Sequence, residues 1–199
     1  MENPLKKEPF LIFCLLFYSG MAILGLALAK GFATLEPFRA PRFHQEALFG
    51  WGAAVLLGIT AGTLSGLSLR TRAGRRMVAE LARLLPDLNA ADHFVVALAS
   101  GIGEELLFRG ALLPLLGLPL SSCLFGAMHW PFRPSLRLWT GYALVMGFAM
   151  GGLALATGCV WFPVITHAVA NFIGFRLIAR LRLRKGRKTQ EATLPTPRS

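Results

Sequence analysis

Hydrophobic positions along the chain form long continuous runs, and most of these runs contain no charged residue. A helix of about 20 apolar residues crosses a hydrocarbon core of roughly 30 Å. A helix also satisfies its own backbone hydrogen bonds where no water is present. The pattern therefore predicts an all-α fold, a polytopic membrane helix bundle with about six transmembrane helices. These helices are expected at residues 10–29, 47–69, 94–113, 114–131, 138–156 and 161–179.

The chain is organised as one structural unit, because the short connections between the runs leave no room for a soluble domain. Residues 1–93 are expected to form two N-terminal transmembrane helices and a basic loop. Residues 94–179 are expected to form a four-helix membrane core, and residues 180–199 a basic disordered tail. No internal repeat is evident in the sequence.

The composition agrees with a membrane protein. Of the 199 residues, 54% are hydrophobic and 16% are charged, and the mean hydropathy is +0.55, which excludes a disordered chain and an ordinary cytosolic enzyme. The formal charge of +11 does not indicate a nucleic-acid partner, because the basic residues punctuate apolar runs instead of forming a stripe. Cys14, Cys123 and Cys159 lie in apolar stretches and are expected to be small core or lipid-facing residues.

Lysine and arginine are concentrated in two short segments, residues 70–83 and 180–188. Short loops rich in these residues stay in the cytoplasm. With six spans, both termini are then cytoplasmic, and the size and arginine-rich loops suggest a bacterial inner membrane. The basic tail is a candidate binding site for anionic lipid headgroups, although it also serves as a topology signal.

The first apolar run has the outline of a cleavable signal peptide, because Lys6 and Lys7 precede it and it ends in Ala-Leu-Ala at 27–29. Its apolar length exceeds that of a usual signal sequence. We therefore expect an uncleaved transmembrane helix.

Three charged residues interrupt the run at 94–113. Each charge at a helix centre costs about 2.5–3.5 kcal/mol on insertion scales, so Glu104, Glu105 and Arg109 need a compensating role. On a helix, Glu105 and Arg109 lie about 40° apart, whereas Glu104 lies about 140° from Arg109. The spacing predicts a pair between Arg109 and Glu105 that leaves Glu104 free to face a cavity. A buried ion network that only locks helices together is the alternative.

Polar residues on the neighbouring runs reach the same depth. Glu104, His129 and Asn171 each lie about ten residues from the start of their own helix, which places them near one membrane level. His167 and Asn171 share a helix face at i, i+4. The convergence predicts a polar site inside the membrane. Small residues that allow close helix approach there are Gly101, Gly103, Gly126, Gly147, Gly151 and Gly152.

Three ordered motifs carry this site: E-E-x-x-x-R, then F-x-x-x-H, then H-x-x-x-N. They resemble the motifs of the CAAX protease and bacteriocin-processing family of intramembrane glutamic endopeptidases, over about residues 94–175. The resemblance implies that the four-helix core is catalytic and cleaves a membrane protein or peptide substrate. The matching residues are Glu104, Glu105, Arg109, Phe125, His129, His167 and Asn171.

Peptide hydrolysis needs an activated water, oxyanion donors and a proton for the leaving amine. A carboxyl group in a low-dielectric site makes Glu104 a credible general base and later acid, and His129 is expected to orient or help deprotonate the water. His167 and Asn171 are expected to donate hydrogen bonds to the oxyanion, which is the role that the resemblance implies.

The remaining motif residues are expected to support the site. Arg109 and Glu105 would hold the Glu104 helix in position, and Phe125 would pack beneath His129. Trp130, next to His129, either belongs to an interfacial aromatic belt or walls the site.

Three alternatives remain open at this point. The first is a zinc-dependent, metalloendopeptidase-like version of the same protease, in which Glu104, His129 and His167 ligate Zn²⁺. The favoured interpretation is metal-free, without a cofactor. The second is a transporter or proton relay, because intramembrane charges also serve such pathways. The third is a non-catalytic membrane scaffold.

Overall fold

The computed structural model of the chain describes residues 6–39, 45–131 and 133–193. All regular structure in these residues is helical and none of it is strand, which confirms the predicted all-α class. Five helical segments are long and apolar enough to cross a membrane. The seven α-helices are α1 Lys7–Gly31, α2 Gln45–Leu67, α3 Arg72–Leu84, α4 Ala90–Glu105, α5 Leu113–Met128, α6 Arg137–Thr157 and α7 Trp161–Thr193.

Four shorter helical segments join these helices. A π-helical segment, Leu106–Leu112, connects α4 directly to α5. The 3-10 turns are Glu36–Phe38, Ser68–Arg70 and Pro134–Leu136.

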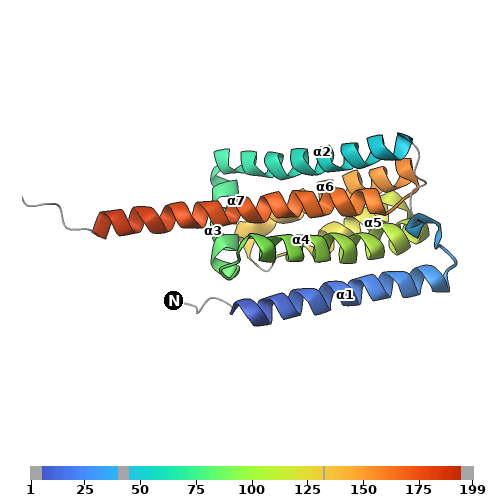
Figure 1. The fold of residues 1–199 in the computed structure, drawn as a ribbon, viewed down its shortest axis with the longest axis horizontal. Helices are drawn as coiled ribbons and strands as arrows, with labels where there is room; N and C mark the ends of the chain where they lie inside the picture. The colour runs from blue at the N-terminus through green and yellow to red at the C-terminus, as the bar shows by residue number, and fades with distance from the viewer. Residues whose placement is uncertain (1–5, 40–44, 132, 194–199) are drawn as a thin grey trace, which may run out of the picture.

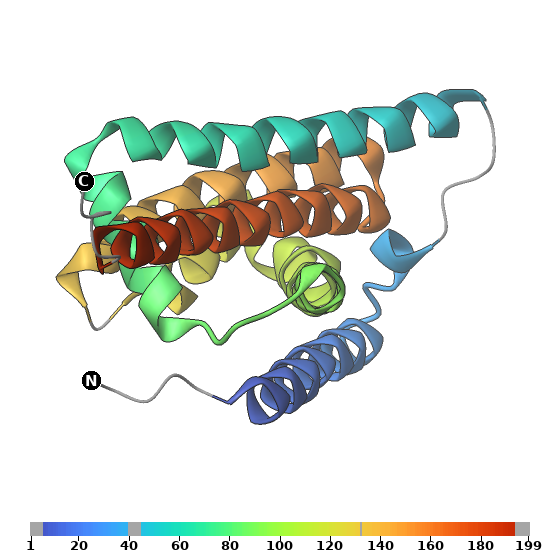
Figure 2. The same cartoon turned by 60° about the vertical axis from the view of Figure 1, so that its left-hand side comes forward.

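The central helix of the bundle is α7, which lies between α2 and α4, with α1 on the far side of α4 and with α5 and α6 behind them (Figure 1). After a turn of the view, α4 is seen nearly end-on while α2 and α7 run across the picture, so α4 is strongly inclined to both (Figure 2). Glycines permit this close packing. A Cβ on Gly58 of α2 would lie 2.7 Å from the Thr166 carbonyl oxygen of α7, and one on Gly103 of α4 would lie 2.5 Å from the Tyr18 carbonyl oxygen of α1.

The segment from α4 to α5 folds back on itself at Gly117. Glu104 and His129 are 25 residues apart, a distance of about 37 Å in a straight helix, yet Glu104 Oε2 lies 3.8 Å from His129 Nε2. Gly117 makes the reversal with φ 74° and ψ 169°, a conformation that favours glycine. The candidate span Ala90–Met128 therefore has two legs, which correspond to the third and fourth of the six predicted helices.

The second leg pairs with α6 in an antiparallel arrangement. Gly151 faces Leu118, Gly147 faces Ser122, and the Thr140 hydroxyl donates to the His129 carbonyl oxygen at 2.7 Å. Five of the six glycines singled out in the sequence lie at such helix contacts. Gly152 does not, because a Cβ there would meet open space.

The structure corrects two predictions for the basic segments. Residues 72–84, expected to be loop, form the amphipathic helix α3, which is capped by Thr71 and buries Met77 and Val78. The expected disordered tail is helical as far as Thr193, because no proline interrupts α7 between Pro163 and Pro195. Residues 194–199 lie outside the described residues, and the predicted domain boundaries stay predictions.

The first helix packs along α4 in a parallel direction. Lys7 Nζ lies 2.8 Å from Asp92 Oδ2, and Asp92 also closes a capping box with Asn89 at the start of α4. Uncleaved retention of α1 stays a prediction. Cys14 and Cys159 are buried, Cys123 is exposed, and all three are free thiols.

Candidate active site

The most buried charged residue is Glu105, at the end of α4, which is 0% exposed. Its Oε1 accepts hydrogen bonds from Arg109 Nη1 at 2.9 Å and from His167 Nδ1 at 2.7 Å. Arg109 Nη2 also donates to the Gly147 carbonyl oxygen at 3.1 Å. The pair between Arg109 and Glu105 is the one that their spacing predicts, and it connects α4 with α6 and α7.

The π-helical segment begins immediately after the two glutamates. Widened helical turns of this kind often occur at functional sites. Here the turn carries Arg109, and every residue from Gly103 to Ala111 is buried. The charged motif therefore lies inside the protein and does not face lipid.

Glu104 faces away from this network and toward two imidazole rings. Its Oε2 lies 3.8 Å from His129 Nε2 and 3.8 Å from His167 Nε2. Both distances exceed a direct hydrogen bond, and Oε2 is buried without a hydrogen-bond partner. Separations of this size are those that a bridging water spans. Glu104 and His129, which the sequence places near one membrane level, therefore lie close together, and His167 lies beside them.

Hydrogen bonds to the other ring nitrogens orient both histidines. His129 Nδ1 lies 2.8 Å from the Phe125 carbonyl oxygen, which can only accept, so this nitrogen carries a proton. His167 Nδ1 donates in the same way to Glu105. In the neutral form of each ring, Nε2 is then an unprotonated acceptor directed at Glu104.

Phe125 lies at the centre of the aromatic packing around the site. The Arg109 guanidinium carbon is 4.3 Å from the centroid of its ring. The His129 ring lies 4.7 Å away and the Phe108 ring 5.0 Å away, centroid to centroid. Phe125 therefore supports His129 and covers Arg109 with one side chain.

Asn171 is held by Ser100, a residue that the sequence analysis did not identify. Asn171 Nδ2 donates to Ser100 Oγ at 2.9 Å, and the Ser100 hydroxyl donates to the Ala97 carbonyl oxygen at 3.0 Å. The signal in the sequence is its spacing, since Ser100 precedes Glu104 by four residues on the same helix face. The second N–H hydrogen of Asn171 is left for another acceptor.

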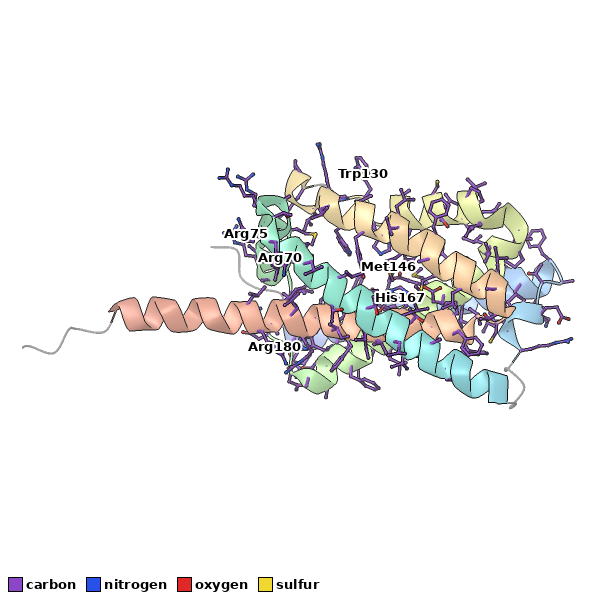
Figure 3. The ribbon with its side chains drawn as sticks, turned by 90° about the horizontal axis from the view of Figure 1, so that it is seen from above. Arg70, Arg75, Trp130, Met146, His167 and Arg180 are labelled. Atoms are coloured by element: carbon purple, nitrogen blue, oxygen red, sulfur yellow. The ribbon has the colours of Figure 1, made fainter. Side chains whose placement is uncertain are left out.

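A cavity of about 30 Å³ lies beside these side chains, close to the volume of one water molecule. Figure 3 shows two of its lining residues, His167 and Met146, in the space between α2 and α6. The lining residues are Phe125, His129, Trp139, Tyr142, Ala143, Met146, Met150, His167 and Asn171.

Trp139, not Trp130, is the tryptophan of the site. The Trp139 ring stands edge-on to the His129 ring at 5.4 Å between centroids. Trp130 is 65% exposed. The suggestion that Trp130 walls the site is therefore wrong: α5 ends at Met128, and α6 returns alongside it to bring Trp139 against His129.

The donor set of Glu104, His129 and His167 is of the type found in catalytic zinc sites. The ligand atoms of a tetrahedral zinc site lie about 3.3 Å apart, and the measured separations between Oε2 and the two Nε2 atoms are 3.8 Å. No group of three or more His, Cys, Asp or Glu side chains in the described part of the chain has the spacing to hold a metal ion. The present geometry fits water better than it fits zinc.

A comparison with known families gives a match over the segment that carries these residues. Residues 86–173 match the family described as type II CAAX prenyl endopeptidase Rce1-like. This segment is therefore similar to the CAAX protease family. The match to this family of proteases covers the whole segment from α4 to Asn171, and thus all seven motif residues, whereas α1, α2 and α3 lie outside it. No curated protein and no solved structure gives a significant match to the chain.

The five apolar helical segments and the match to a membrane protease family support an integral membrane protein. The matched family is described as one of endopeptidases.

Proposed function

We propose that the chain is an intramembrane endopeptidase that hydrolyses a peptide bond with a water molecule activated by Glu104 and His129. One observation carries the proposal. A buried carboxylate oxygen without a hydrogen-bond partner, Glu104 Oε2, lies 3.8 Å from the Nε2 atoms of His129 and His167, and both rings line a cavity large enough to hold a water molecule.

The first step uses Glu104 as general base. A water held between Glu104 Oε2 and His129 Nε2 gives its proton to the carboxylate while its oxygen attacks the scissile carbonyl carbon. The proton then passes from Glu104 to the leaving amine as the C–N bond breaks. Because Phe125 fixes the proton on His129 Nδ1, the Nε2 lone pair is available to orient the water.

The oxyanion is stabilised by donors from α7. The second amide hydrogen of Asn171 is available for this task, since Ser100 takes the first. His167 can contribute only as an imidazolium, because its Nδ1 hydrogen is already bound by Glu105 and its Nε2 needs a second proton to donate. Glu105 and Arg109 act by positioning: they fix the His167 ring and the helix that carries Glu104.

No step of this mechanism passes through a metal ion, and we propose that the enzyme works without a cofactor. A zinc-dependent version remains the second candidate because its donor set is present. We also propose, from the arginine-rich segments, a bacterial inner-membrane location with both termini in the cytoplasm and with anionic lipid headgroups near the basic end of α7.

The decisive experiment compares peptide termini in membranes of cells that express the wild-type chain or Glu104→Gln at matched abundance. Glutamine keeps the shape of the side chain and removes the base, so we expect the rate of new termini to fall by about 10²–10⁴-fold. Thermal unfolding in detergent controls for the fold. Equal sets of termini from two folded proteins would contradict the proposal and favour a scaffold or transporter.

A further inference from the structure

A second and much larger hollow lies next to the candidate active site. It is an apolar groove of about 700 Å³ between α2 and α6, floored by α7 and bordered at one end by α3. Figure 3 looks toward it, with α2 and α6 separated along the groove. Its volume lies in the range of ligand-binding pockets. The residues that line it include Leu57, Leu64, Met77, Val145, Leu153 and Ile178.

The groove and the catalytic cavity share part of their lining. Trp139, Tyr142, Met146, Met150 and Asn171 line both. These side chains therefore form the boundary between the apolar groove and the groups that surround Glu104. A substrate that lies in the groove contacts these side chains where the groove adjoins the catalytic cavity.

Tyr142 is the residue of this boundary that reaches across the groove. It projects from α6, and its hydroxyl donates to the Ala61 carbonyl oxygen of α2 at 3.5 Å. A hydrogen bond of this length is weak. The contact can therefore be exchanged for a shorter one when another acceptor arrives.

A peptide that is cleaved inside a membrane bundle requires hydrogen-bond donors for its backbone carbonyl groups. The scissile region must be extended, so its carbonyl and N–H groups lose their helical partners, and each unpaired group is costly in apolar surroundings. The walls of the groove are apolar and would favour the apolar part of a substrate but not its opened backbone. The Tyr142 hydroxyl stands where the two environments meet.

We propose that Tyr142 is a specificity-determining residue that separates an apolar substrate groove from the catalytic cavity. The occupant of the groove is an apolar segment of a membrane-embedded polypeptide, which enters sideways between α2 and α6. The Tyr142 phenol leaves Ala61 and donates to a backbone carbonyl of the extended substrate next to the scissile bond. This inference rests on the proposed endopeptidase function and adds to it the class and the route of the substrate.

The test does not depend on cleavage. A synthetic leucine- and alanine-rich peptide that carries one photo-leucine is incorporated into liposomes with the full-length Glu104→Gln chain, irradiated, and mapped by mass spectrometry. We expect adducts on groove residues such as Leu57, Leu64 and Val145. In a Tyr142→Ala background, adducts on Phe125 and His167, which line the cavity and not the groove, should rise several-fold, because the boundary is removed.

Two further variants make the result specific. Phe148→Ala removes an exposed aromatic side chain from α6 outside the groove lining and should leave the adduct pattern unchanged. Tyr142→Phe, the milder change, keeps the ring and should keep the cavity residues protected. Adducts confined to the outer faces of the bundle, or the same pattern for Tyr142→Ala and Phe148→Ala, would overturn the inference.

Failure of the proposed endopeptidase function can be distinguished from failure of the proposed role of Tyr142. If the wild-type chain and Glu104→Gln gave equal sets of termini, the proposed endopeptidase function would be contradicted. Photo-adducts in the groove would still report on binding of the peptide. If Glu104-dependent termini appeared, Tyr142→Ala should change their sequence positions and Phe148→Ala should not. Unchanged positions would contradict the role of Tyr142 while leaving the protease in place.

Discussion

Glu105 and His167 lie 62 residues apart in the chain and share a hydrogen bond of 2.7 Å between Oε1 and Nδ1. The same oxygen accepts from Arg109. The bond fixes which nitrogen of His167 carries its first proton and directs the other at Glu104. The chemistry of the site therefore depends on a residue that the substrate does not need to touch.

Removal of Arg109 should destabilise the fold strongly. Arg109→Met leaves Glu105 as a buried carboxylate without its cation, a change that costs about 3–5 kcal/mol. The free energy of unfolding in detergent measures this loss. Arg39→Met is the matched control, because Arg39 and Glu36 form an exposed pair with side chains 75% and 72% accessible. A surface pair is worth about 0–1 kcal/mol, so similar losses in the two variants would refute the prediction.

Ser100→Ala should slow cleavage without unfolding the protein. The variant removes one hydrogen bond that orients Asn171, worth about 1 kcal/mol or about a fivefold change in rate. The readout is the rate at which Glu104-dependent termini accumulate, with Ser100→Thr expected to restore most of it. Ser121→Ala is the control, since that buried hydroxyl donates within its own helix. An unchanged rate in Ser100→Ala would show that Asn171 needs no positioning.

Metal chelators should not affect cleavage. The mechanism proposed above uses only the side chains of the chain, so the Glu104-dependent termini should persist in EDTA and in 1,10-phenanthroline. Loss of these termini in chelator, with recovery on addition of zinc, would establish the zinc-dependent alternative.

Gly117→Ala should weaken the hairpin between α4 and α5. With φ at 74° and ψ at 169°, an alanine there adopts a conformation that costs about 1–3 kcal/mol. Thermal unfolding in detergent measures the change. Gly152→Ala, a helical glycine with open space around it, should be neutral or slightly stabilising. Equal effects of the two substitutions would mean that the reversal tolerates a side chain.

The sequence predicts what periodicity and spacing can encode. The apolar runs predict the helices, and the i, i+4 spacing predicts the pair between Glu105 and Arg109. The sequence pattern does not predict which tryptophan faces His129, because that depends on the antiparallel packing of α6 against α5. The contact of Ser100 with the site is not predicted for a similar reason, since its partner Asn171 lies 71 residues away.

Two local features of the structure do have a signal in the sequence. Met77, Val78, Leu81 and Leu84 recur at helical spacing between arginines, and this predicts the amphipathic helix α3. The sharp reversal at Gly117 had a glycine and two nearby prolines as signals. What these signals leave open is the direction in which the chain continues, which only the packing of α5 on α6 determines.

The final membrane helix in the described part of the chain, α7, supplies two of the four proposed catalytic residues, His167 and Asn171. Chains are synthesised from the N-terminus, and earlier segments associate first. Until α7 has inserted beside α4, Glu104 faces one imidazole instead of two, and Glu105 has Arg109 but no histidine to orient. A partly inserted chain therefore lacks two of the four proposed catalytic residues, so the order of insertion during biosynthesis determines when the proposed site is assembled.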